Sequence, residues 1–203
     1  ENKEYFEDVY INYAPGDNGG AIGAALVVGN KYFDKIENLR TPYTGIEYSN
    51  NDIEKVLKNS FYQNKFSYKL IEDDKVFYQS VAKLISQGNV IGWFQGKMEF
   101  GPRALGNRSI LADPSNPKMK EIINLKIKRR ESFRPFAPAV LAEKVNEYFD
   151  LNRKSPYMML VAPILKKRRL IFNKSKTENM LEIIKQPRSD IPATTHIDYS
   201  ARI

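Results

Sequence analysis

The chain has 203 residues, of which 42% are hydrophobic and 28% are charged, a balance typical of one globular domain with or without part of another. No apolar run approaches the roughly 18 residues that a membrane-spanning helix needs, and the first residues lack the pattern of a signal peptide. The chain contains no cysteine, which excludes disulfides and thiolate chemistry. We therefore expect a cytoplasmic protein that does not bind membranes.

The formal net charge of +8 is compatible with three kinds of partner: a nucleic acid, an acidic surface or a polyanionic small molecule. Basic residues cluster at 126–130 and 166–169. Neither cluster has the aromatic spacing of a single-strand binding platform, a recognition helix or a zinc finger. We therefore expect no nucleic-acid partner, and we expect the second cluster to be a solvated face.

Near the N-terminal end, the composition predicts a strand at 8–13, a glycine-rich turn at 14–20 and a buried helix at 21–28. Such an order can present a helix N-terminus to phosphate, or the carboxylate of Asp17 to a metal. A plain turn explains the same glycines. The polar segment 31–73 is expected to be a linker that contains a short helix near 52–59.

A regular pattern begins at residue 74, where apolar residues recur at helical spacing and Gly88 is placed to end the helix. Strands are predicted at 90–94 and 108–112, with a glycine-rich loop between them. The pair Asn116–Pro117 indicates the start of another helix, because it supplies an N-cap and a proline for the first turn. The expected buried side of that helix consists of Met119, Ile122, Ile123 and residues 125–127.

The remaining chain continues the alternation of strands and helices. Strands are predicted at 133–141, 157–164 and 191–203, and helices at 142–148 and around 178–185. Alternation over about 130 residues indicates an α/β domain with a mixed sheet.

The most informative stretch is 96–114, which places Lys97, Arg103, Arg108 and Ser109 among three glycines directly after a predicted strand. Glycine lets the backbone approach a ligand closely, and arginine can hold two phosphate oxygens at once. We predict that these side chains converge on a phosphorylated or otherwise anionic small molecule. The alternative is a surface loop with solvated charges.

Two arginines flank the entry to the predicted strand at 133–141, and we expect Arg130 and Arg134 to close the same pocket from its other side. Nearby carboxylates, Glu99 and Glu131, would orient these arginines or bind magnesium, and a surface ion pair is an equally good interpretation.

His196 is the only histidine. If residues 191–203 form a strand, alternation places His196, Asp198 and Arg202 on one face. Such a group suits the binding of a polar ligand or proton transfer, and a structural histidine is the alternative. The chain has neither a Gly-Lys-Ser/Thr loop nor a Gly-x-Gly-x-x-Gly motif, so a nucleotide would have to bind through arginines and a strand-end loop.

Four segments together resemble the nodulation-type O-carbamoyltransferases, in the right order and over nearly the whole chain; they are 15–25, 92–114, 133–138 and 194–202. The long glycine-arginine run is the most specific of them. The resemblance implies an α/β fold with a YrdC-like twisted mixed sheet and flanking helices. It assigns residues 45–203 to this domain, truncated at its C-terminus, and residues 1–40 to the end of an actin-like carbamoyl-transfer domain. We therefore expect a piece of a longer protein.

In that family, the YrdC-like domain makes carbamoyl-adenylate from carbamoyl phosphate and ATP. The transfer domain then passes the carbamoyl group to a hydroxyl of a sugar or natural product. The resemblance thus implies ATP and Mg²⁺, with Fe²⁺ or another divalent metal in the transfer domain. The implied site residues are Lys97, Arg103, Arg108 and Arg134 as catalytic groups, Ser109, Arg130, His196, Asp198 and Arg202 in ligand binding, and Asp17 as a metal ligand.

One departure from the family pattern lies at Asp198-Tyr199-Ser200, where the family more often has Asp-Gly-Thr. The charged segment 166–190 has no clear counterpart. Two other functions stay open: a double-stranded RNA-binding module, because some YrdC relatives have concave basic surfaces, and a non-catalytic interaction or homodimerisation module.

Overall fold

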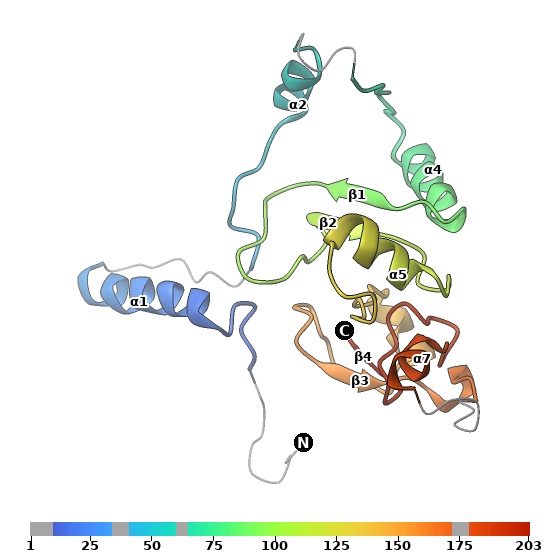
Figure 1. The fold of residues 1–203 in the computed structure, drawn as a ribbon. Helices are drawn as coiled ribbons and strands as arrows, with labels where there is room; N and C mark the ends of the chain where they lie inside the picture. The colour runs from blue at the N-terminus through green and yellow to red at the C-terminus, as the bar shows by residue number, and fades with distance from the viewer. Residues whose placement is uncertain (1–9, 34–40, 60–64, 172–178) are drawn as a thin grey trace. The chain divides into compact units, whose positions relative to one another are not determined.

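A computed structural model describes residues 10–33, 41–59, 65–171 and 179–203 (Figure 1). The chain divides into two compact units, the first formed by residues 1–67 and 94–109 and the second by 68–93 and 110–203. The chain passes from the first unit to the second after residue 67. It then returns within strand β1 (Ile91–Phe94) and leaves again within β2 (Arg108–Leu111), and these two strands pair with each other. The domain boundary near residues 40–45 that the resemblance implies stays a prediction.

The described chain is mixed α and β, with small sheets. Besides the β1–β2 pair, strand β3 (Val161–Pro163) pairs antiparallel with β4 (Ser200–Arg202), and Ala162 lies opposite Ala201. The α/β class is confirmed, whereas the YrdC-like sheet and the actin-like remnant stay predictions. In the described ranges, no helix is long and apolar enough to span a membrane.

The first unit contains helices α1 (Asp17–Tyr32) and α2 (Asn50–Leu57). A capping box explains where α2 begins, because the side chains and backbones of Ser49 and Asp52 hydrogen-bond reciprocally. Both helices were predicted, but α1 begins at Asp17, so that residues 17–20 of the turn expected at 14–20 are helical. The expected burial of α1 is also wrong, since none of its residues is buried. The strand expected at 8–13 is also absent from its described part, residues 10–13, and residues 8–9 lie outside the described chain.

In the second unit, α4 (Asp74–Ser86) begins after the N-cap Asp73 and is followed by Gly88, whose φ of +85° suits glycine alone. Both ends agree with the predicted helix. The other helical segments are α5 (Met119–Ile123), the π-helical turn η1 (Asn124–Lys128), the 3₁₀ turns η2 (Ala142–Lys144) and η3 (Lys166–Arg168), α6 (Val145–Tyr148) and α7 (Met180–Lys185).

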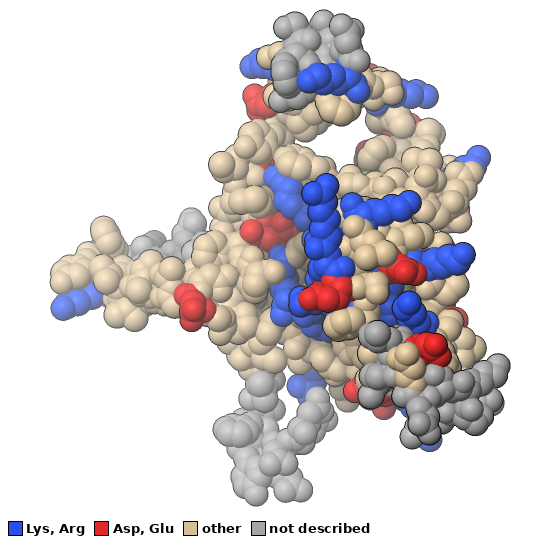
Figure 2. All heavy atoms as spheres, in the orientation of Figure 1, with Lys and Arg blue, Asp and Glu red and all other residues tan. Residues whose placement is uncertain are grey.

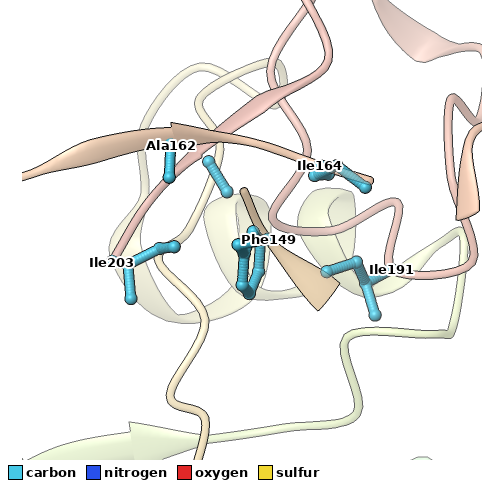
Figure 3. Close-up of a cluster of buried hydrophobic side chains, with 6 residues drawn as sticks. Phe149, Ala162, Ile164, Ile191 and Ile203 are labelled. Carbon is cyan, nitrogen blue, oxygen red and sulfur yellow. The ribbon is translucent and has the colours of Figure 1, made fainter. Parts of the chain in front are cut away.

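Two apolar clusters form the core of the second unit. One packs Phe149 against the β3–β4 pair and consists of Phe149, Ala162, Ile164, Ile191, Ala201 and Ile203 (Figure 3). The other consists of Met119, Ile123 and Ala193, with Val90, Ala112 and Phe136 packed on it. Burial of each large apolar side chain stabilises the fold by about 1.5–3 kcal/mol.

Three strand predictions in this unit need correction. Residues 133–141 form turns and irregular backbone, in part because Pro135 and Pro138 have no N–H for a strand ladder. The strands expected at 157–164 and 191–203 shrink to β3 and β4.

The predicted buried side of the helix that contains α5 also needs correction. Residues Leu125 and Ile127, expected inside, are 54% and 44% exposed. The π-helical turn η1 changes the angular spacing of the side chains, so that the apolar face of α5 does not continue through it.

Candidate functional site

Glu99 organises the loop between β1 and β2. Its Oε1 atom accepts hydrogen bonds from the backbone N–H groups of Leu105 and Asn107, both at 2.8 Å, and of Arg108 at 3.2 Å. Burial raises the pKa of Glu99, but the backbone donors of Asn107, Leu105 and Arg108 together lower this pKa below its ordinary value. The ionised carboxylate therefore ties the second half of the loop to the first.

Residues 42–46 brace the same loop. Backbone hydrogen bonds join Gly45 N–H to the Met98 carbonyl at 2.9 Å, and Met98 N–H to the Ile46 carbonyl at 3.1 Å. The hydroxyl of Tyr43 donates to the Leu105 carbonyl at 2.8 Å. The loop is thus held by the carboxylate of Glu99 and by residues 42–46 of the same unit.

Arg108 uses its guanidinium within this loop. The Nη1 atom donates to the carbonyl oxygen of Gln95 at 2.6 Å, and Nη2 donates to the carbonyls of Gly96 at 3.1 Å and Ile46 at 3.2 Å. The guanidinium also lies 3.5 Å from the ring centroid of Phe94, within the range of a cation–π contact. Arg108 therefore stabilises the loop, and its predicted contact with a phosphate stays a prediction.

Arg103 differs from Arg108. Its side chain is half-buried, and its buried Nε atom has no hydrogen-bond partner in the described part of the chain. Ser109 lies in β2, directly after the loop, and its Oγ accepts a hydrogen bond from Gly106 N–H at 3.0 Å. Lys97 is exposed. Because a buried donor without a partner is costly, Arg103 is the loop cation best suited to an added anion.

The loop also lies next to the turn that precedes α1. Gly101 has a φ of +123°, and a Cβ atom there would lie 3.2 Å from the Tyr13 carbonyl oxygen and 3.8 Å from the Asn18 side chain. Asp17 is the first residue of α1, directly after this turn. Among the described residues, however, no three His, Asp or Glu side chains are placed to hold a metal ion. A metal at Asp17 would need further ligands, and its role as a metal ligand stays a prediction.

In the second unit, Asn124 holds the segment that carries Arg130 and Arg134. The Asn124 side chain is fully buried; its Nδ2 donates to the carbonyls of Arg134 at 2.8 Å and Ser132 at 3.3 Å, and its Oδ1 accepts from Arg130 Nε at 2.6 Å. The guanidinium of Arg130 lies 5.1 Å from the ring centroid of Phe136. Arg134 is exposed and forms an ion pair with Glu131 at 2.8 Å. One buried amide thus fixes the backbone and one guanidinium of this segment.

The prediction that His196 and Asp198 share a strand face is wrong, because both lie in a turn that precedes β4. Ser200 brings them together instead: its Oγ lies 3.0 Å from His196 Nδ1 and donates to Asp198 Oδ1 at 2.6 Å. Between them, Tyr199 has a φ of +64°, a conformation that favours glycine. The Asp-Gly-Thr that the resemblance implies at this position would place a glycine there, and glycine adopts such a φ without strain.

The charge states in this turn follow from its geometry. Burial lowers the pKa of His196, Asp198 opposes this change and Arg202 adds to it, so that the pKa is below its ordinary value. The Ser200 hydroxyl lowers the pKa of Asp198. Near pH 7 the turn therefore holds a neutral imidazole and an ionised carboxylate.

The family model described as "Carbamoyltransferase C-terminus" matches residues 82–203, more than half of the chain. The chain belongs to this carbamoyltransferase C-terminal family. The match includes β1, β2, the loop between them, Asn124 and the His196 turn.

Curated relatives of this carbamoyltransferase C-terminal chain extend the similarity to residues before 82. An uncharacterized protein, sll1178, of Synechocystis sp. is 48% identical over 98% of this chain and 33% of its own length. Nodulation protein NolNO of Sinorhizobium fredii is 36% identical over 98% of this chain and 26% of its own length. The 3'-hydroxymethylcephem-O-carbamoyltransferase of Amycolatopsis lactamdurans is 27% identical over 98% of this chain and 32% of its own length. The chain thus spans a third or less of the length of these relatives.

The predicted site residues of this carbamoyltransferase C-terminal chain fall into two groups, one in each unit. The first unit contains Asp17, Lys97, Arg103, Arg108 and Ser109, and the second contains Arg130, Arg134, His196, Asp198 and Arg202. The contribution of each residue to ligand binding stays a prediction.

Sequence reasoning missed two residues that position these groups, Asn124 and Ser200. The spacing Asp-x-Ser could have indicated Ser200, because an aspartate commonly caps the residue two positions later. No comparable signal marks Asn124, which is buried at the first position of the π-helical turn η1.

Proposed function

We propose that this chain is the part of a carbamoyltransferase that binds carbamoyl phosphate and ATP and forms carbamoyl-adenylate. The observation that carries the proposal is the buried Nε of Arg103, which has no partner among the described residues, in a loop that Glu99 and Arg108 hold together. Membership of the family and the name of the cephem O-carbamoyltransferase relative support the carbamoyl chemistry.

The proposed reaction balances in two steps. Water first displaces phosphate from carbamoyl phosphate and leaves carbamate. A carbamate oxygen then attacks the α-phosphorus of ATP, and pyrophosphate leaves with the electrons of the broken phosphoanhydride bond. Cations that offset the charge of adjoining phosphates favour such a step, and Lys97 and Arg103 are the loop side chains that we propose for this role. Mg²⁺ would accompany the ATP phosphates.

We assign the acceptor, a hydroxyl of a sugar or natural product, to the full-length protein. The curated relatives are much longer than the region they share with this chain, which covers a third of sll1178 and 26% of NolNO. We propose that the acceptor site and the divalent metal of the transfer reaction involve the regions of such relatives that this chain does not match.

Isothermal titration of the chain with ATP and with carbamoyl phosphate tests the proposal, together with an assay of pyrophosphate release. We expect both ligands to bind, and we expect pyrophosphate release to require carbamoyl phosphate. The matched variants are Arg103→Ala and Arg153→Ala, the latter at an exposed arginine that makes no hydrogen bond or ion pair with the described residues. Absence of binding by both ligands, or equal effects of the two variants, would contradict the proposal.

The same samples distinguish the RNA-binding alternative. Figure 2 shows acidic side chains among the lysine and arginine side chains of the face that it draws, which does not favour a purely electrostatic RNA surface. If the chain instead bound double-stranded RNA with steep salt dependence and bound no ATP, RNA binding would replace the proposed activity. The slope should then decrease in Arg129→Ala, since Arg129 is exposed in the basic cluster at 126–130.

A further inference from the structure

The hydroxyl of Ser200 has a single proton, and its two neighbours decide where this proton goes. Asp198 is ionised, so Oδ1 can only accept, and it lies 2.6 Å from Ser200 Oγ. The Ser200 proton therefore points to Asp198, and only an oxygen lone pair remains for His196. Because Nδ1 of His196 lies 3.0 Å from this oxygen, Nδ1 must supply the proton of that hydrogen bond.

We infer that Ser200 and Asp198 hold neutral His196 as the Nδ1–H tautomer, so that Nε2 offers a lone pair to a donor group of the bound substrate. Ser200 is then a positioning residue that acts through the histidine. The inference rests on the proposed function for the identity of the ligand, but the tautomer itself does not depend on it.

The surroundings of the ring fit this assignment. The backbone closes the turn, since His196 N–H donates to the Ser200 carbonyl at 2.8 Å, and Tyr199 N–H donates to the His196 carbonyl at 3.2 Å. Ser200 is 6% exposed, which shields its hydroxyl from exchange with water. The imidazole is only half-buried, and within the described ranges no group hydrogen-bonds to Nε2. Nδ1 is thus hydrogen-bonded to the protein, and Nε2 is available to a ligand.

The ligand chemistry that would match Nε2 is an N–H or O–H donor. Carbamoyl phosphate offers its amide N–H groups, and ATP offers the adenine amino group and the ribose hydroxyls. An unprotonated Nε2 cannot donate to a phosphate oxygen, so this histidine would recognise a part of the substrate other than its phosphates. The two substrates share this chemistry, and separate titrations distinguish them.

The tautomer can be measured directly, because His196 is the only histidine in the chain. Long-range ¹H–¹⁵N correlation spectra of the ¹⁵N-labelled chain at pH 8 give one imidazole spin system. We expect a protonated Nδ1 and an unprotonated Nε2. A predominant Nε2–H tautomer in the unmodified chain would overturn the inference.

Two variants test the cause of the tautomer. In Asp198→Asn, the new amide can donate to Ser200 Oγ and release the serine proton toward Nδ1, so the Nε2–H form should increase. In Ser200→Ala the fixed tautomer should be lost as well. The control is Ser115→Ala, because Ser115 Oγ donates to Asp113 at 2.7 Å in an equivalent Asp-x-Ser turn that has no histidine. An unchanged tautomer in Asp198→Asn would contradict the proposed role of the pair, even if Ser200→Ala did not fold.

The ligand half of the inference is tested by following the Nε2 resonance during separate titrations with ATP and carbamoyl phosphate. We expect one of them to move Nε2 while Nδ1 stays protonated. If calorimetry shows binding and neither ligand moves Nε2, the inference fails and the proposed function stands. If neither ligand binds, the proposed function fails together with the assignment of the ligand, whereas the tautomer measurement still decides the role of Ser200.

Discussion

The side-chain oxygen of Asn124 accepts a hydrogen bond from Nε of Arg130 at 2.6 Å, and Asn124 is completely buried. The same amide donates to two backbone carbonyls of the segment 132–134. All of its hydrogen-bonding atoms are therefore used, which is the usual condition for a buried polar side chain. The terminal Nη atoms of Arg130 have no protein hydrogen bond within the described chain, so both can donate to a ligand.

We predict that Asn124→Ala lowers the free energy of unfolding by about 3 kcal/mol, because it leaves the carbonyls of Ser132 and Arg134 and the Nε of Arg130 without this partner. Urea unfolding followed by circular dichroism measures the change. Asn152→Ala is the matched control in the same unit, since Asn152 is exposed, and it should be within about 0.5 kcal/mol of the unmodified chain. Similar stabilities of the two variants would show that the buried amide does not hold this segment.

The Asn124 segment shows where prediction from sequence ends. Local signals sufficed for α4, since the N-cap Asp73 and the stop at Gly88 lie in the sequence itself. The strand expected at 133–141 failed because its aromatic and apolar residues pack in irregular backbone, which Asn124 holds through side-chain hydrogen bonds. These hydrogen bonds come from a residue outside the predicted strand, so the alternation of apolar and polar residues within 133–141 cannot reveal them.

We predict that Glu99→Gln weakens the loop between β1 and β2. The amide cannot match an ionised carboxylate as acceptor for three backbone N–H groups, and hydrogen bonds to charged groups contribute about 1.5–3 kcal/mol. Faster amide hydrogen exchange at Leu105, Asn107 and Arg108 measures the loss. Glu47→Gln, at an exposed glutamate of the same unit, should leave these amides unchanged. Equal protection in both variants would contradict this role.

The pH dependence of that effect has a definite sign. The folded-state pKa of Glu99 lies below its ordinary value of 4.5, since its backbone donors favour the charged form. The stabilisation by the carboxylate is therefore fully present above pH 4.5 and is lost as the pH falls through the lower, folded-state pKa. The difference in stability between the unmodified chain and Glu99→Gln should thus shrink under acid conditions, and a difference that grows would reverse this conclusion.

Arg103 and Arg108 should respond differently to substitution. Arg108→Lys keeps the charge but loses the planar fork that bonds to the Gln95 and Gly96 carbonyls, so we expect a loss of stability of about 1–3 kcal/mol. Arg103→Ala should instead weaken ATP binding by about 1.5–3 kcal/mol and leave the unfolding midpoint nearly unchanged. Thermal unfolding and calorimetry on both variants separate the two roles, and the reverse pattern would exchange them.

The candidate site, like the fold, could be predicted from the sequence only where the signal is local. Glycines and cations that are close in sequence, such as Gly101 and Arg103, identified the loop, but the sequence does not say whether an arginine turns to a ligand or to its own backbone. For His196, alternation along a strand suggested that Asp198 lies nearby, which is right, but through a strand that does not form at these residues. The turn closed by Ser200 brings the two together, and the backbone at Tyr199, with its positive φ, departs from the extended conformation predicted for 191–203.

We predict that the folded chain becomes less stable as the pH falls from 7.5 to 5.5. Burial lowers the pKa of His196 from its ordinary value near 6.5, Asp198 opposes this and Arg202 adds to it, so the unfolded chain takes up a proton that the folded chain does not. In His196→Asn this part of the pH dependence should disappear. Urea unfolding at the two pH values measures it, and a chain that is more stable at pH 5.5 would contradict the lowered pKa.

Gly101 offers a test of how the loop meets the turn before α1. A φ of +123° strains any residue with a side chain, and a Cβ atom would also lie 3.2 Å from the Tyr13 carbonyl oxygen. Gly101→Ala should therefore lower the free energy of unfolding by about 1–3 kcal/mol. Gly23→Ala is the matched control, because Gly23 lies in α1 with open space around it, and alanine there should stabilise the helix by up to about 1 kcal/mol. If both substitutions stabilised the chain, the loop would not depend on this close approach, and Glu99, Arg108 and residues 42–46 would suffice to hold it.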